Sequence, residues 1–347
     1  MGTNMIVKSR VRGGALLAAT TIGMTVLGAV PASAAEGHWE ATFLTLPAGS
    51  ELSRGFVTGA DGHGGYAGAF PIGGTSQIVT WKNGAPTVHG VPAGYEWAMA
   101  WDQNGSGTVV GDASDYDTGD TRPFVLDANG FRVLPVPAGF SYVYGVAVND
   151  QGDVVGNAHK KDDPDGTRAV LWRATATSAG PELLPAGLLA TDIDDDGTVL
   201  LSRLHNGGFV WKNGALTGVT APAGYESVTV RAINAGRIVG SAYDPAIRDS
   251  QAFVWSTPST AEALPGGVYG VDLNSHGLTT GLEPAPEPIR NRSVTWQGTE
   301  RTGPLPTPAG FGRAQGRVVS EDGTIAGITS DNPLDEGGTP VVWHYVR

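Results

Sequence analysis

The sequence contains no cysteine, few basic residues and only one long apolar run. Without cysteine the protein forms no disulfide, so its stability must come from a packed core. Outside residues 13–30, no apolar stretch approaches the roughly 18 residues of a transmembrane helix. The chain contains 22 Lys and Arg residues and 34 Asp and Glu residues, which gives a net charge of −12. Such a chain repels nucleic acids and anionic membranes, and we expect neither as a partner.

The N-terminal segment has the pattern of a secretory signal. Lys8, Arg10 and Arg12 form a basic start, residues 13–30 are apolar, and Ala32-Ser33-Ala34 is a small-residue cleavage motif. The sequence therefore predicts a signal peptide over residues 1–34 and a secreted, extracellular mature protein.

The rest of the chain, residues 36–347, repeats one unit seven times. A Pro-Ala-Gly-like corner opens each unit, a short turn from Asn or Asp to Gly follows, and an apolar stretch ending in Trp comes next. The units lie near residues 47–91, 92–136, 137–184, 185–221, 222–264, 265–307 and 308–347 plus 38–46. The landmark residues at the ends of the apolar stretches are Trp81, Leu126, Trp172, Trp211, Trp255, Trp296 and Trp343. We expect these large side chains to lie in the core.

Each unit divides into four short strands. In unit 222–264, residues 227–233 alternate in polarity as a first strand, and Asn234-Ala235-Gly236 supplies a tight turn. Four strands in a repeat of about 40 to 45 residues are typical of a propeller blade. The sequence therefore predicts an all-β fold, a single seven-bladed β-propeller.

The two ends of the repeat region complement each other. Residues 340–347 match a third strand with no fourth strand after it, and residues 40–46 match a fourth strand with no first three before it. We expect the N-terminal strand to complete the last blade and so to close the ring.

The repeat resembles the bacterial extracellular HAF-repeat family, which is named for a His-Ala-Phe tripeptide. The similarity rests on Gln251-Ala252-Phe253-Val254-Trp255 and on the segment from Arg231 to Gly240, although Gln251 stands in place of the His. The resemblance covers essentially the whole mature chain. It implies a secreted β-repeat protein and brings no shared catalytic residues.

Aromatic residues recur near the corners that open the units. On a rigid scaffold, variable loops and rings at the mouth are the usual place for ligand binding. The candidate ligand-binding residues are Tyr95, Trp97, Phe140, Tyr142, Tyr225 and Phe311. The alternative is that rings repeated with this period pack between blades.

Two clusters carry candidate chemistry. Asp192, Asp194 and Asp196 precede a Gly in a pattern that resembles a calcium loop, although the ligands expected further along the chain are missing. The alternative is an Asp-rich version of the repeat turn. His159 and His205 follow the second strands of neighbouring units, where they could act as an acid/base pair.

Two functions remain open from the sequence. The absence of recognisable hydrolase, metalloprotease and phosphate-binding motifs favours a non-catalytic binding module. Its expected partner is a neutral glycan or another extracellular protein, bound on the variable-loop face by a monomer without a cofactor other than calcium. The alternative is a propeller lyase or hydrolase that uses His159 and His205.

Overall fold

The structure is a computed structural model that describes residues 37–51, 55–160, 163–175, 180–203, 207–286, 290–331 and 337–347. Residues 37–347 form one compact unit. The described residues contain strands β1 to β28 and no helix, so none of them forms a helix that could span a membrane. The predicted signal peptide and His205 lie outside the described residues.

Five separate sheets have four strands each. Two of them contain β2 (Phe56–Ala60), β3 (Gly65–Ile72), β4 (Thr75–Lys82) and β5 (Ala85–Gly90), and β14 (Leu189–Ile193), β15 (Val199–Ser202), β16 (Gly208–Lys212) and β17 (Ala215–Val219). The next two contain β18 (Ser227–Asn234), β19 (Arg237–Asp244), β20 (Asp249–Thr257) and β21 (Thr260–Ala263), and β22 (Tyr269–Leu273), β23 (Leu278–Pro284), β24 (Asn291–Gln297) and β25 (Glu300–Pro304). The fifth contains β26 (Arg313–Val319), β27 (Ile325–Ser330), β28 (Thr339–Val346) and β1 (His38–Phe43).

The sixth sheet has eight strands. It joins β6 (Trp97–Gln103), β7 (Val109–Ser114), β8 (Thr121–Asp127) and β9 (Gly130–Val133) to β10 (Tyr142–Val148), β11 (Val154–Lys160), β12 (Asp163–Trp172) and β13 (Glu182–Ala186). Strands β8 and β10 are joined by a single parallel pair, Tyr142 with Thr121. The guanidinium of Arg122 donates to the carbonyl oxygens of Thr121 and Ser141 beside this pair, at 3.1 and 2.8 Å, and so holds the two strands together.

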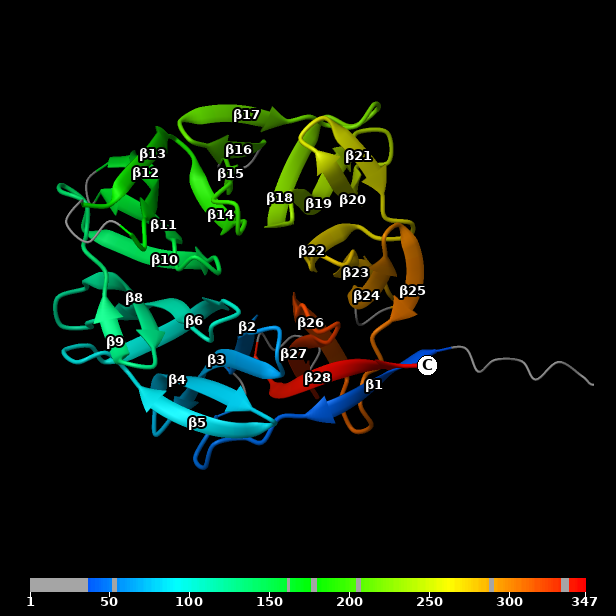
Figure 1. Ribbon diagram of the computed structural model, residues 1–347. Coiled ribbons are helices and arrows are strands. Elements are labelled where there is room, and N and C mark those ends of the chain that lie inside the picture. Colours follow the sequence, from blue (N-terminus) through cyan, green and yellow to red (C-terminus); the bar gives the residue numbers. More distant parts are fainter. Residues whose placement is uncertain are drawn as a thin grey trace, which may run out of the picture. The chain divides into compact units, whose positions relative to one another are not determined.

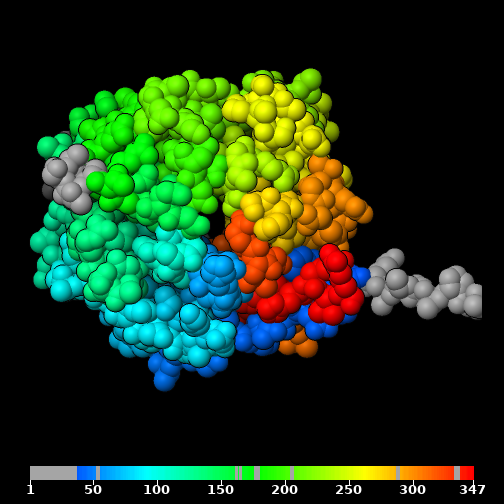
Figure 2. Space-filling model, viewed as in Figure 1, coloured from blue at the N-terminus to red at the C-terminus, as the bar shows by residue number. Residues whose placement is uncertain are grey.

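The all-β propeller prediction is confirmed, but the prediction of seven separate blades is wrong. The structure has five separate four-stranded blades and one continuous eight-stranded sheet, not seven blades. The first strands β2, β6, β10, β14, β18, β22 and β26 pack against one another in chain order, as Figure 1 shows. The surface in Figure 2 is hollowed between these strands.

The predicted closure by the N-terminal strand also needs correction. Strand β1 pairs antiparallel with β28, from His38 with Val346 to Phe43 with Val341. However, β1 is the outer strand of its sheet, and the contact with the first blade is made by β26 and β27 against β2. The N-terminal strand therefore extends one sheet, and it does not itself close a ring.

The landmark residues form the core, as predicted. Trp255, Trp296 and Trp343 are fully buried, and the other landmark residues are buried as well. The indole nitrogens also bind the segment that precedes their unit: Trp255 donates to the carbonyl of Thr220 at 3.0 Å. The predicted turn after β18 is confirmed, since Ala235 and Gly236 have φ angles of 49° and 75°.

We expect Trp39→Ala in β1 to destabilise the protein by about 3 kcal/mol, because it removes a buried ring and leaves a cavity. The indole of Trp39 packs among Leu278, Val341 and Trp343, and its nitrogen donates to the hydroxyl of Thr295 at 3.0 Å. Chemical denaturation measures the change, with Glu40→Ala, an exposed position in the same strand, as the control. Equal stability of the two variants would show that β1 is not part of the folded core.

Candidate functional site

The candidate site is a cavity of about 660 Å³ between the two halves of the eight-stranded sheet. It lies beside the pair of Tyr142 and Thr121 that joins the halves. The lining residues are Trp97 and Trp101 from β6, Asp112 and Ser114 from β7, Tyr116 from the loop after β7, Tyr142 and Tyr144 from β10, and His159 from β11. None of these eight residues is Lys or Arg.

Six rings make up most of the cavity wall, and we call this cavity the aromatic pocket. The rings of Tyr144 and His159 stack with centroids 5.7 Å apart and planes 14° apart. The ring of Tyr142 meets both of them edge-on, at 5.6 Å. Trp101, Tyr142 and Tyr116 remain 41%, 45% and 68% exposed, so their rings are available to a ligand. Several exposed rings facing one cavity are unusual for a monomer surface and mark a binding site.

Asp112 is the one carboxylate in the aromatic pocket, and only 5% of its surface is exposed. The indole nitrogen of Trp101 donates a hydrogen bond to Asp112 Oδ1. Burial raises the pKa of Asp112 to about 6, and the hydrogen bond from Trp101 opposes this rise. Within the described part of the chain, Asp112 forms no ion pair with Lys or Arg. The pocket therefore holds an uncompensated negative charge at neutral pH.

The negative charge of Asp112 also affects the pKa of the two neighbouring tyrosines in the pocket. Burial is the main cause of the raised pKa of both Tyr142 and Tyr144, and the negative charge of Asp112 adds to it. Both hydroxyls are therefore protonated at neutral pH. Burial lowers the pKa of His159, whose Nδ1 lies 2.9 Å from the hydroxyl of Thr167 in a hydrogen bond. The imidazole is neutral at pH 7.5, so no cationic side chain balances Asp112 from within the pocket.

The structure brings two of the six predicted ligand-binding residues together, Trp97 and Tyr142. The other four lie outside this cavity with their side chains partly buried, and ligand binding by them stays a prediction. Tyr95 packs against the cluster around Phe124, and Phe140 against the cluster around Trp172. Tyr225 meets Phe253 edge-on at 4.9 Å, and Phe311 lies 5.5 Å from Phe43.

Sequence reasoning missed Trp101, Asp112 and Tyr116 as site residues. The segment from Trp97 to Trp101 alternates large and small side chains, which in a regular strand places Trp97 and Trp101 on one face, and the bulge falls at Trp101 itself. That alternation was the available signal. Nothing in the sequence indicates that Asp112 faces the same cavity, because this depends on how the two halves of the sheet meet.

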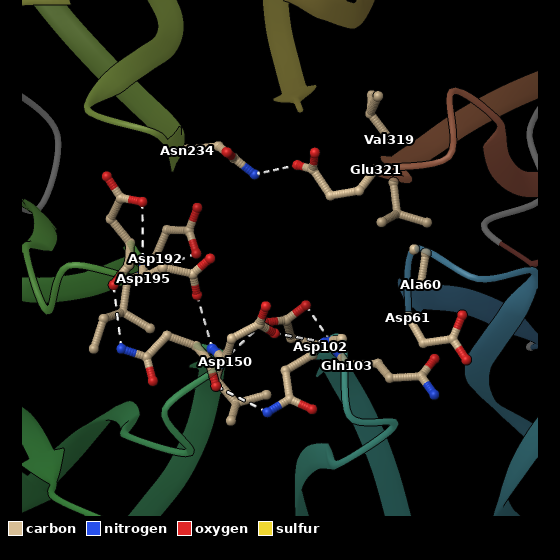
Figure 3. Close-up of a pocket in the computed structure, with 18 of the residues that line it drawn as sticks. Ala60, Asp61, Asp102, Gln103, Asp150, Asp192, Asp195, Asn234, Val319 and Glu321 are labelled. Atoms are coloured by element: carbon tan, nitrogen blue, oxygen red, sulfur yellow. Dashed lines mark hydrogen bonds between the residues drawn. The ribbon is translucent and has the colours of Figure 1, made fainter. Parts of the chain in front are cut away.

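A second cavity of about 270 Å³ lies at the turn end of the first strands, and we call it the acidic cavity. Figure 3 shows the acidic residues around it. Three aspartates there, Asp102, Asp192 and Asp272, occupy the same position in β6, β14 and β22. One oxygen of each carboxylate accepts a hydrogen bond from the backbone N–H of the next residue in its own strand. The other accepts from the first strand of the following unit: Val148 for Asp102, Ile233 for Asp192 and Val319 for Asp272. These carboxylates therefore clamp neighbouring first strands together.

The carboxylates of the predicted calcium loop have separate partners. Asp192 is one of the clamps, and Asp194 accepts from the backbone amides of Ala235 and Gly236 at 3.0 and 2.6 Å. Asp196 forms an ion pair with Lys212 at 2.5 Å. The described residues include no group of three or more His, Asp or Glu in an arrangement that could hold a metal ion. Calcium binding by Asp192, Asp194 and Asp196 stays a prediction.

No protein-family model and no curated protein matches the chain. Among solved structures, an acylaminoacyl peptidase from Pyrococcus horikoshii has a TM-score of 0.51 at 16% identity, covering 74% of this chain and 45% of that chain. The β-propeller domain of the Trilobed protease from Pyrococcus furiosus, which has an open velcro topology, has a TM-score of 0.51 at 12% identity. The match covers 75% of this chain and 86% of that chain. YCF48 bound to D1 peptide has a TM-score of 0.50 at 10% identity, and the match covers 89% of this chain and 97% of that chain.

These similarities show the propeller fold alone. This chain spans less than half the length of the acylaminoacyl peptidase. The prediction of a non-catalytic binding module is wrong as an inference from the fold, because propellers of this fold occur in peptidases as well as in a peptide-bound protein. The alternative with His159 and His205 stays a prediction, since His159 lines the aromatic pocket and His205 lies outside the described residues. Membership of the HAF-repeat family stays a prediction.

Proposed function

We propose that the protein binds an organic cation, a ligand with an ammonium group, in the aromatic pocket. The observation that carries this proposal is the buried carboxylate of Asp112, which is surrounded by aromatic rings and has no Lys or Arg partner among the described residues. The faces of Trp and Tyr rings attract cations through their quadrupoles, by about 0.5 to 2 kcal/mol each. A carboxylate at the base of such rings adds a charge-assisted contact. Together they favour an ammonium group over a neutral ligand of the same size.

The size and polarity of the pocket fit this ligand class. A cavity of about 660 Å³ accepts a molecule larger than a single ammonium group, so the rings are able to hold an apolar body as well. The neighbouring loop adds negative charge with Asp115 and Asp117, which attracts cations toward the opening, whereas Asp120 is paired with Arg122 at 2.7 Å. An anionic ligand is disfavoured by the same charges.

Calorimetric titration with choline tests the proposal, and its pH dependence is part of the expected result. Choline should bind saturably at pH 7.5, where the pKa of Asp112, raised by burial to about 6, leaves the carboxylate ionised. Affinity should fall as the pH drops through 6, and by about tenfold at pH 5, where roughly a tenth of the carboxylate remains ionised. A neutral disaccharide should not bind. Saturable disaccharide binding without choline binding, or choline affinity that is flat from pH 7.5 to 5, would contradict the proposal.

We also propose that the protein acts outside the cell. This rests on the basic start, the apolar stretch and the Ala32-Ser33-Ala34 motif of the N-terminal segment.

A further inference from the structure

A third cavity, of about 810 Å³, lies among strands β18, β19 and β22, and we call it the tyrosine pocket. Tyr243 and Tyr269 contribute its aromatic rings, which are 36% and 39% exposed. Glu226 contributes an exposed carboxylate. Among the described residues, neither Lys nor Arg lines this cavity.

The repeat places the tyrosine pocket at positions equivalent to those of the aromatic pocket. Trp97 and Tyr142 begin β6 and β10, just as Ser227 and Tyr269 begin β18 and β22. Across the first hairpin, Trp97 pairs with Ser114, and Ser227 pairs with Tyr243. Three positions of the repeat therefore line both pockets, whereas Gly207, Val219 and Ala221 of the preceding unit line the tyrosine pocket alone.

A glutamate stands at the same position of the repeat beside both pockets, although only Glu226 lines its pocket. The backbone amide of Glu96 donates to the carbonyl of Ser114 at 3.1 Å, and that of Glu226 donates to the carbonyl of Tyr243 at 3.0 Å. The carboxylate of Glu96 accepts from the backbone amide of Tyr116, which lines the aromatic pocket. Each pocket thus has rings and, directly before a first strand, a neighbouring glutamate.

The two pockets open at the same end of the molecule. All the first strands run from the pocket end toward the tight turns, and those turns surround the acidic cavity. Figure 1 shows β6 and β10 on one side of the centre and β18 and β22 on the other. A ligand long enough to cross this end can therefore reach both pockets.

We propose that the tyrosine pocket is a second subsite for the same ligand, which then carries two cationic groups joined by a spacer. This inference rests on the proposed function of the aromatic pocket. A ligand that occupies both subsites gains affinity because the second contact is intramolecular, with an effective concentration set by the spacer. A ligand with one cation gains nothing from the tyrosine pocket once the aromatic pocket is occupied.

The test compares choline with bis(trimethylammonium) compounds joined by flexible ethylene-glycol spacers of increasing length. We expect affinity to rise at least tenfold above that of choline once the spacer reaches across the mouth. In the double variant Tyr243→Ala, Tyr269→Ala this gain should disappear, while choline affinity stays unchanged. The variant Ile247→Ala is the control, because Ile247 is 68% exposed on the loop after Tyr243 and does not line the pocket.

Two results separate this inference from the proposed function. If choline binds but no dication binds more tightly, or if the gain survives in the double tyrosine variant, the second subsite is wrong and the proposed function stands. If the wild-type protein binds neither choline nor any dication, the proposed function is wrong, and the second subsite with it.

Discussion

Replacing Asp112 by Asn should weaken choline binding by about 10- to 100-fold at pH 7.5 and should at the same time raise the thermal stability of the protein. The amide keeps the shape of the side chain, and its oxygen still accepts the hydrogen bond from Trp101. What is lost is the negative charge. The quaternary ammonium of choline has no N–H to donate, so the loss is Coulombic. Two unit charges about 7 Å apart attract by about 2 kcal/mol at an effective dielectric constant of about 20, which corresponds to this loss of affinity.

The gain in stability follows from the raised pKa of Asp112, which burial moves to about 6. At pH 7.5 the folded protein must ionise a carboxyl that the unfolded chain ionises more readily, and this costs on the order of 2 kcal/mol. Asn removes that cost. Opposite changes in binding and stability distinguish lost recognition from a damaged fold.

The matched control for this variant is Asp117→Asn. Asp117 is exposed, and its side chain does not line the aromatic pocket, so the same loss of charge should change choline affinity less than twofold in physiological salt. Titration calorimetry and thermal melts measure both properties. If Asp112→Asn binds choline as tightly as the wild type, Asp112 does not recognise the cation.

Acidification from pH 8 to pH 5 should stabilise the protein, whereas most proteins gain little or lose stability over this range. The reason is the set of clamping aspartates around the acidic cavity. Burial, opposed by the backbone hydrogen bonds, raises the pKa of Asp102 and of Asp272 from 3.8 to about 7. Burial, followed by the charge of Asp102, raises the pKa of Asp192 well above its ordinary value.

The direction of the effect follows from proton binding. Between about pH 4 and pH 7 the folded protein holds protons on these carboxyls that the unfolded chain has already released, so stability falls as the pH rises. Each of these residues keeps part of its surface exposed, so solvent screening reduces the effect to about 2 kcal/mol in total. For a unit of the size of residues 37–347 that is a change in Tm of about 3 °C.

Thermal melts from pH 8 to pH 5 measure this effect, and the double variant Asp102→Asn, Asp272→Asn should flatten the profile. The control is Asp244→Asn, a substitution outside the acidic cavity. Below about pH 4 the trend should reverse, because Asp196 and Asp322 have lowered pKa values from their hydrogen-bond partners and lose stabilising charge there. A wild-type Tm that falls steadily from pH 8 to pH 5 would contradict this assignment.

Local patterns in the sequence predicted much of the fold. The turn at Ala235 and Gly236 and the burial of Trp255 follow from short-range rules, namely backbone conformation and hydrophobic burial. The joining of β8 to β10 could not be predicted, because it depends on one backbone pair and on the reach of the Arg122 side chain between units. Counting repeats therefore gave separate blades where the structure has one continuous sheet.

The candidate site was only partly predictable for the same reason. Trp97 and Tyr142 begin first strands, so their place at the mouth follows from the repeat. Asp112 belongs to a second strand, and its neighbours come from both halves of the eight-stranded sheet. Periodicity also grouped Tyr225 and Phe311 with the site residues, although both rings pack against other aromatic residues.

The most direct test of the account compares choline with 3,3-dimethylbutan-1-ol, its neutral isostere, by calorimetric titration of the wild-type protein at pH 7.5. The two ligands have the same shape, so the difference in their affinities reports the charge alone. The account predicts that choline binds at least tenfold more tightly, because the rings and the carboxylate of Asp112 attract the ammonium group. Equal affinity for the two ligands would show that the pocket selects for apolar shape and would contradict cation recognition.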